Sequence, residues 1–252
     1  MNENKFTGLG KTYAKFRPNY PQSFIDYLYS GVGINKESII ADIGSGTGIL
    51  TKQLLEQGNK VFAVEPNKDM RIIAEADLSI YENFTSVNAT AENTTLESSS
   101  VDFITVAQAF HWFDESRFKK ECNRIIKPNG KVTLVWNSRD TDADVVKESD
   151  AILKKYCPNF KGFSGGMRGT EDENTHYKNF FNGEYITKTF QNDITFDLDG
   201  FIGRNRSASY ALKEDEKNFT EYIEELSECF YKHVINGIMT MPNLTRSYTG
   251  TV

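Results

Sequence analysis

The chain has 252 residues, of which 38% are hydrophobic and 25% are charged, a composition typical of a globular protein. Its net charge of −6 argues against nucleic acid as a partner, because phosphate contacts need clustered lysine and arginine. No apolar run approaches the roughly 20 residues that span a bilayer, and the first residues lack the apolar region of a secretory signal. We therefore expect a cytoplasmic protein with neither a nucleic-acid nor a membrane partner.

Apolar strands and amphipathic helices alternate through the first 140 residues. The pattern predicts helices at 22–30, 49–56, 66–76 and 115–126, and strands at 39–43, 61–65, 84–88, 101–106 and 131–136. This alternation is typical of βαβ units and a parallel sheet. Ligands bind such sheets beyond the carboxyl ends of the strands. The residues that follow strands, namely 44–48, 65, 91–92 and 108–112, are therefore the candidates for a site.

The pattern changes after Arg139. It predicts a helix over 144–156, a glycine-rich loop over 162–169, a strand or hairpin over 184–197, a long helix over 214–236, and β-like pieces over 237–241 and 245–251. A lid or substrate-binding insertion is expected in such a segment. We predict one domain over 1–252, with an N-terminal lid (1–30), a cofactor-binding core (31–140), a substrate insertion (141–210) and a C-terminal helix and strands (211–252).

Three glycines at alternate positions, Gly44, Gly46 and Gly48, follow the strand that contains Asp42. Glycine lets the backbone turn sharply and approach a ligand, and the next helix directs free N–H groups to the same place. The nicotinamide-dinucleotide fingerprint, G-x-G-x-x-G, has its third glycine one residue later. Asp42 would repel a pyrophosphate but attract the sulfonium and ammonium groups of S-adenosylmethionine. Charge favours S-adenosylmethionine, and a nicotinamide dinucleotide is the alternative.

Several motifs, in order along the chain, resemble those of class I S-adenosylmethionine-dependent methyltransferases. They are Asp42 to Gly48, Glu65-Pro66, Ala91-Glu92 and the stretch from Ala107 to Phe113. Residues 13–21 and 134–140 resemble the small-molecule branch called methyltransferase type 11, which includes trans-aconitate methyltransferase-like proteins. The resemblance covers residues 6–140 well, is weak over 140–210 and is partial near the C-terminus. Asn129 replaces a glycine that is usual in the family, and asparagine tolerates the left-handed conformation that a turn there needs.

The resemblance implies an α/β, Rossmann-like class I methyltransferase fold. Its mostly parallel seven-stranded sheet would be flanked by helices and carry an N-terminal lid and an α-rich insertion. It also implies that the glycines and Asp42 hold the methionine end of the cofactor, that Glu65 accepts the ribose hydroxyls, and that Arg17 meets the methionine carboxylate. The full cofactor-binding set is Tyr13, Arg17, Asp42, Gly44, Ser45, Gly46, Gly48, Glu65, Pro66, Met70, Ala91, Glu92, Gln108, Ala109 and Phe110.

The implied reaction is an in-line displacement, in which the protein aligns the nucleophile with the methyl group and excludes water. His111 is the titratable group beside the expected methyl position, and it is either a general base or a packing residue of the motif. Trp112 and Trp136 either wall the acceptor pocket, contact the sulfonium through a cation–π interaction, or pack in the core.

The predicted function is methyl transfer to a small molecule that bears a carboxylate, a hydroxyl or a similar group. The alternatives are a nicotinamide-dependent oxidoreductase and a non-catalytic module that binds S-adenosylmethionine. The three cysteines, Cys122, Cys157 and Cys229, are widely spaced, which predicts free thiols and no metal site. The chain is expected to be a monomer or a homodimer.

Overall fold

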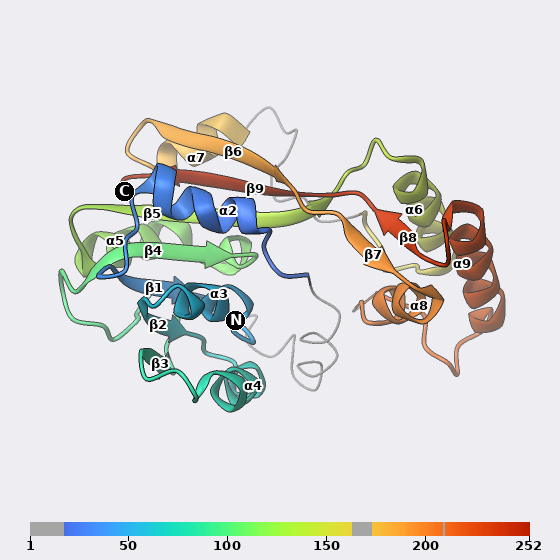
Figure 1. Ribbon diagram of the computed structural model, residues 1–252, viewed down its shortest axis with the longest axis horizontal. Helices are drawn as coiled ribbons and strands as arrows, with labels where there is room; N and C mark the ends of the chain where they lie inside the picture. Colours follow the sequence, from blue (N-terminus) through green and yellow to red (C-terminus); the bar gives the residue numbers. More distant parts are fainter. Residues whose placement is uncertain (1–17, 163–172, 209) are drawn as a thin grey trace.

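The computed structural model describes residues 18–162, 173–208 and 210–252 of the chain. They form a larger body built on a sheet and a smaller lobe beside it (Figure 1). The seven strands of the sheet lie in the order β3-β2-β1-β4-β5-β9-β6. Their bounds are β1 Ile39–Ile43, β2 Lys60–Val64, β3 Phe84–Val87, β4 Val101–Ala107, β5 Ile126–Arg139, β6 Tyr185–Gln191 and β9 Asn243–Gly250. Strand β9 runs in the direction opposite to the other six strands of this sheet, which confirms the predicted mostly parallel fold.

Helices cover both faces of the sheet, because successive side chains of a strand point to opposite faces. Ile40 and Val135 pack in the cluster that also holds residues of α2 (Gln22–Tyr27), the following π-helix η1 (Leu28–Val32), α3 (Ile49–Glu56) and α4 (Lys68–Leu78). Ala41 and Leu134, one residue away on the same strands, pack with residues of α5 (Glu115–Ile125) and α7 (Glu173–Phe180). The sheet therefore has a hydrophobic core on each face.

Strand β5 begins earlier than predicted. The residues expected as a turn, 127–130, lie inside β5 as an irregularity, because Val101 pairs with Ile126 and the register resumes with Phe103 opposite Lys131. Asn129 has a φ of 68°, so the left-handed conformation expected there is confirmed. The predicted turn is therefore present, but it interrupts strand β5 rather than preceding it, because β5 pairs with β4 on both sides of the turn.

The smaller lobe has its own hydrophobic core, which includes Leu153, Phe201, Tyr222 and Met239. Its elements are α6 (Asp144–Tyr156), β7 (Ile194–Phe196), α8 (Leu198–Arg206), α9 (Phe219–His233) and β8 (Met239–Met241). Strand β7 pairs with β8, whereas β6 joins β9 in the main sheet, so residues 184–197 form two strands that do not pair with each other.

The predicted insertion, 141–210, is thus shared between the two lobes, because α7 and β6 belong to the larger body. The predicted long helix is shorter, as α9, and helix α8 was not predicted. Gly200 and Gly203 lower the helix propensity of α8, but the Asp197 side chain caps its first turn by accepting from the Gly200 N–H at 2.7 Å.

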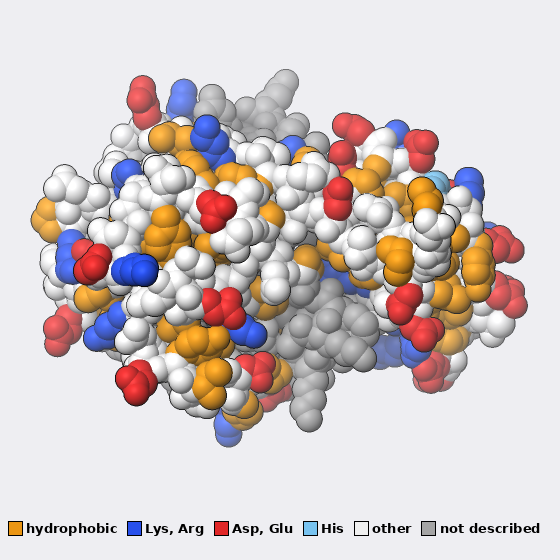
Figure 2. Space-filling model, in the orientation of Figure 1, with side chains coloured by type: hydrophobic (Ala, Val, Ile, Leu, Met, Phe, Trp, Pro, Cys, Tyr) orange, Lys and Arg blue, Asp and Glu red, His pale blue; other side chains and the backbone are white. Residues whose placement is uncertain are grey.

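Acidic and basic side chains are interspersed over both lobes on the face that Figure 2 displays. Among the residues that the structure describes, no helix has the length and apolar character needed to cross a membrane. The glycine-rich loop expected at 162–169 lies almost wholly outside the described residues, as does most of the predicted N-terminal lid.

Candidate functional site

The glycine turn after β1 is tied to the end of β2. The N–H groups of Gly44 and Ser45 both donate to the Val64 carbonyl, at 2.8 and 3.1 Å. Gly46 has a φ of 57°, and a Cβ built on it would meet nothing within 4 Å. A Cβ on Gly48 would instead lie 2.6 Å from Leu78 Cδ1 of α4. Gly46 therefore presents bare backbone to open space, whereas Gly48 allows two helices to pack closely.

Asp42 lies beneath this turn, with 1% of its surface exposed. Its carboxylate accepts hydrogen bonds from the Thr51 hydroxyl at 2.6 Å and the Thr105 hydroxyl at 2.8 Å. Burial raises the pKa of Asp42 to about 6, against the lowering effect of these hydrogen bonds. Asp42 therefore fastens β1 to α3 and β4 and lines neither cavity described below, and its expected contact with the methionine end of the cofactor, directly or through water, stays a prediction.

Glu65 follows β2 and joins the glycine turn to the start of α4. Its two carboxylate oxygens accept hydrogen bonds from the Gly46 N–H at 3.0 Å and the Asn67 N–H at 2.8 Å. Burial raises the pKa of Glu65, and these backbone hydrogen bonds lower it in part. A carboxylate oxygen has room for a second donor, so Glu65 can accept from a ligand while it holds the turn.

The first cavity has a volume of about 400 Å³ and lies beyond the carboxyl ends of β1, β2 and β4. Ten predicted site residues line it, namely Gly44, Gly46, Glu65, Pro66, Met70, Ala91, Glu92, Gln108, Ala109 and Trp112. The sequence did not indicate the others, which include Asn67, Phe113, Asp114 and Arg117. Arg117 lies in the first turn of α5, and it reaches the cavity because of the way in which that helix packs.

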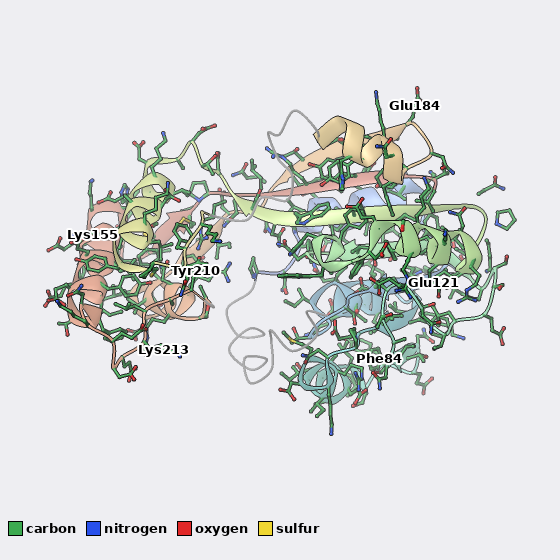
Figure 3. All side chains as sticks on the ribbon, turned by 180° about the vertical axis from the view of Figure 1, so that it is seen from behind. Phe84, Glu121, Lys155, Glu184, Tyr210 and Lys213 are labelled. Carbon is green, nitrogen blue, oxygen red and sulfur yellow. The ribbon has the colours of Figure 1, made fainter. Side chains whose placement is uncertain are left out.

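The second cavity has a volume of about 370 Å³ and lies between the two lobes. It shares Gly44, Gly46, Ala107 and Gln108 with the first cavity, so the two cavities meet there. Ser45 lines it, as predicted for the site. The further lining residues include Asn137, Ser138 and Arg139 from β5, Arg204 from α8, and Tyr210, which Figure 3 places on the side of the smaller lobe that faces the body.

Gln108 holds the junction between the two cavities. It has a φ of 59°, which is uncommon for a residue other than glycine. Its N–H donates to the Val135 carbonyl at 2.9 Å, and its side-chain amide donates to the Asn137 carbonyl at 2.9 Å. These two hydrogen bonds to β5 fix the backbone at the junction of the two cavities.

Five predicted site residues of the described ranges lie outside both cavities: Asp42 and Gly48, described above, and Trp136, Phe110 and His111. Trp136 is 5% exposed and packs with Phe110, Tyr177 and Tyr248, at ring-centroid distances of 6.4, 6.0 and 5.7 Å. Trp136 is absent from the cavities because neighbouring side chains of a strand point to opposite faces of the sheet. The Asn137 side chain faces the second cavity, and the Trp136 side chain faces the core. Phe110 belongs to the same core cluster. His111 is exposed on the short 3-10 helix η2 (Phe110–Trp112) and lines neither cavity.

The remaining predicted site residues are Trp112, Tyr13 and Arg17. Trp112 lines the first cavity, where either an acceptor-pocket role or a contact with the cofactor sulfonium stays a prediction. Tyr13 and Arg17 fall outside the described residues, and their roles at the cofactor stay predictions.

Three potential metal ligands, Glu148, Cys229 and His233, meet in the smaller lobe, with their ligand atoms within 4.8 Å of one another. The Glu148 carboxylate already accepts from Lys232 at 2.8 Å and lies 2.8 Å from His233 Nε2. These contacts lower the pKa of Glu148 although burial alone would raise it. An ion-pair network between α6 and α9 accounts for the cluster.

A family model described as a methyltransferase domain matches residues 41–134. An uncharacterized methyltransferase of Mycobacterium tuberculosis is 38% identical over 141 residues, which are 56% of this chain and 55% of that protein. An uncharacterized methyltransferase of Schizosaccharomyces pombe is 32% identical over 144 residues, 57% of this chain and 56% of that protein. The chain thus spans about half the length of the curated relatives that it matches.

Solved structures share the fold over nearly the whole chain. A putative type II methyltransferase from Anaeromyxobacter dehalogenans has a TM-score of 0.69 at 20% identity, over 94% of this chain and 98% of that one. A putative methyltransferase from an antibiotic biosynthesis pathway of Anabaena variabilis has a TM-score of 0.60 at 18% identity, over 90% and 97%. At these identities the likeness concerns the fold alone.

Proposed function

Because residues 41–134 match a family model of a methyltransferase domain, we propose that the chain is a class I S-adenosylmethionine-dependent methyltransferase and that it methylates a small molecule that binds between its two lobes. One observation carries the proposal. The two cavities meet at Gly44, Gly46, Ala107 and Gln108, so a donor in the first can present its methyl group to an acceptor in the second. In-line displacement needs such an arrangement, with the reacting atoms about 3–3.5 Å apart.

The residues of the first cavity fit S-adenosylmethionine. Gly46 leaves open space where any other residue would carry a Cβ. The Thr47 hydroxyl is buried at the glycine turn, lines the second cavity, and has no hydrogen-bond partner among the residues described. Glu65 would accept the ribose hydroxyls, and Pro66 and Met70 would pack against the adenine. The bound cofactor supplies an activated methyl group, and the protein has only to align it and exclude water.

The acceptor is proposed to carry a carboxylate, a hydroxyl or a similar nucleophile, and the reaction to need no metal. His111 is not proposed as its base, because this residue lies outside both cavities. A cytoplasmic location is supported by the cysteines, since Cys122, Cys157 and Cys229 are all free and buried.

Calorimetric titration with S-adenosylmethionine, S-adenosylhomocysteine and NAD tests the cofactor. We expect both sulfur compounds to bind and NAD not to bind, and tight binding of NAD alone would refute the proposal. Incubation with methyl-labelled S-adenosylmethionine and a metabolite extract then tests transfer. Binding of the cofactor without labelling of any small molecule would favour the non-catalytic module over the enzyme.

A further inference from the structure

We propose that the methyl acceptor is an anion, bound through a carboxylate or phosphate group by Arg139 and Arg204. This inference rests on the proposed function, because it assigns the substrate class of the cavity between the lobes. Arg139 ends β5 in the larger body and Arg204 lies on α8 in the smaller lobe. The two cations therefore approach the cavity from opposite sides.

The charge of the cavity supports an anion. Its lining includes Arg139, Arg204 and Lys161, and no aspartate or glutamate occurs among the described residues that line it. Among the described residues of this lining all the charged side chains are thus basic, whereas the chain as a whole has a net charge of −6. An acceptor with a carboxylate or phosphate would gain charge-assisted hydrogen bonds there, whereas a cationic acceptor would be repelled.

The two arginines line the same two cavities. Besides the second cavity, both line a small adjoining cavity between the lobes, whose wall includes Phe196, Phe201 and Met241. Guanidinium groups remain charged at all physiological pH values and bind carboxylate or phosphate through two parallel hydrogen bonds. The apolar wall limits access of water on one side, which strengthens the interaction with an anion.

Asn137 adds an oriented donor on the same face of β5 as Arg139, since side chains two residues apart share a face. Its side-chain oxygen already accepts from the Asn192 amide at 3.2 Å and from the Thr245 hydroxyl. The part of the Asn137 amide that remains for a ligand is therefore its N–H group. A hydrogen-bond donor at this position again favours a methyl acceptor whose oxygen atoms carry lone pairs.

The side chains of the cavity also suit a nucleophile that is already ionised. None of the lining residues within the described ranges is a histidine, aspartate or glutamate, the usual general bases. A carboxylate or phosphate oxygen attacks a sulfonium methyl group without losing a proton. Its oxygen forms the new bond to carbon while the carbon–sulfur bond electrons return to sulfur, which gives the methyl ester and S-adenosylhomocysteine.

The test uses the full chain and methyl-labelled S-adenosylmethionine. A metabolite extract is divided on an anion-exchange resin into a retained, anionic fraction and a flow-through of neutral and cationic compounds. We expect label to enter small molecules of the retained fraction only. Arg139→Gln and Arg204→Gln should each reduce this labelling about 10- to 100-fold, the loss expected for a hydrogen bond to a charged group. Labelling of the flow-through alone would overturn the inference.

Arg206→Gln is the matched control. Arg206 lies on the same helix as Arg204, pairs with Glu214 and lines neither of the cavities described. The control should keep full labelling, and S-adenosylhomocysteine should bind all three variants as it binds the unaltered protein. Equal activity of Arg204→Gln and Arg206→Gln would contradict the assignment of the arginines.

A binding assay separates this inference from the proposed function. Succinate, inorganic phosphate and neutral succinamide are titrated into protein saturated with S-adenosylhomocysteine. We expect succinate or phosphate to bind, succinamide not to bind, and Arg204→Gln to abolish the binding. The stronger of the two anions identifies the recognised group. Anion binding without methyl transfer would contradict the proposed methyltransferase activity but support the anion site. Methyl transfer to neutral acceptors only would support the proposed activity but contradict the anion site.

Discussion

Replacement of Asp42 by asparagine tests the buried carboxylate beneath the glycine turn. Burial raises the pKa of Asp42 in the folded protein to about 6, from 3.8 in the exposed state. A proton therefore binds the folded state more tightly than the unfolded state. The contribution of Asp42 to stability is full below pH 3.8 and is lost as the pH rises through about 6.

The size of this effect follows from the shift. A difference of about two pKa units, at about 1.4 kcal/mol per unit, makes ionised Asp42 about 3 kcal/mol less stabilising at pH 7 than protonated Asp42. Asparagine keeps an oxygen that can accept one hydrogen bond and a nitrogen that can donate to a threonine hydroxyl, and it does not ionise. We expect Asp42→Asn to raise the free energy of unfolding at pH 7 by about 1–2 kcal/mol, because rearranged hydrogen bonds offset part of the gain.

The assay is urea unfolding of the cofactor-free protein between pH 4 and pH 7.5, followed by circular dichroism. The difference between Asp42→Asn and the unaltered protein should grow by about 2 kcal/mol over this range, because part of the unfolded-state carboxyl is already ionised at pH 4. Asp77→Asn, an exposed acid on α4, is the control and should follow the unaltered protein at every pH. Parallel curves for Asp42→Asn and the unaltered protein would refute the reasoning.

Four further predictions concern the site and the fold. Glu65→Ala should weaken binding of S-adenosylmethionine at least about 100-fold in calorimetry, because two charge-assisted hydrogen bonds are lost, whereas exposed Glu82→Ala should bind normally. Gly46→Ala should cost only about 1 kcal/mol of stability in denaturant but reduce cofactor affinity at least about 10-fold, since its methyl group would enter the cavity; unchanged affinity would place the cofactor elsewhere. His111→Ala should keep methyl transfer within about twofold, and a loss of about 100-fold would restore it as a base. Burial alone would raise the pKa of Glu121, but hydrogen bonds from its partners lower it to about 2, so the destabilisation by Glu121→Gln should be full above pH 4.5 and vanish as the pH falls toward 2 in acid titration.

The cofactor half of the fold was predictable because its signals are local. The bounds of β1 and α3 match the sequence prediction, since an apolar run, a glycine turn and a glycine after the helix define them. Eight residues that follow strands were also expected in the site and line the first cavity, and the family resemblance added Pro66 and Met70. The sequence did not show whether Trp136 or Asn137 faces the cavity. Neighbouring residues of a strand point to opposite faces of the sheet, and both aromatic and amide side chains occur in pocket walls.

The cavity between the lobes could not be read from the sequence. Its lining combines Arg139 on β5, Arg204 on α8 and Asn243 on β9, which come together only through the packing of the smaller lobe. The division of residues 141–210 between the lobes has the same origin. Strand β6 alternates like many surface strands, and only its pairing with β9 assigns it to the larger body.

The position of β9 has a consequence for the order in which the protein assembles. Strand β9 is the last strand of the sheet along the chain, yet it lies between β5 and β6 and pairs with both. Strand β6 therefore lacks its native partner strand during synthesis until residues 243–250 leave the ribosome. The hydroxyl of Thr245, which orients Asn137, arrives with the same strand. The nascent chain can thus fold its first four parallel strands early, but the cavity between the lobes is completed only with this strand.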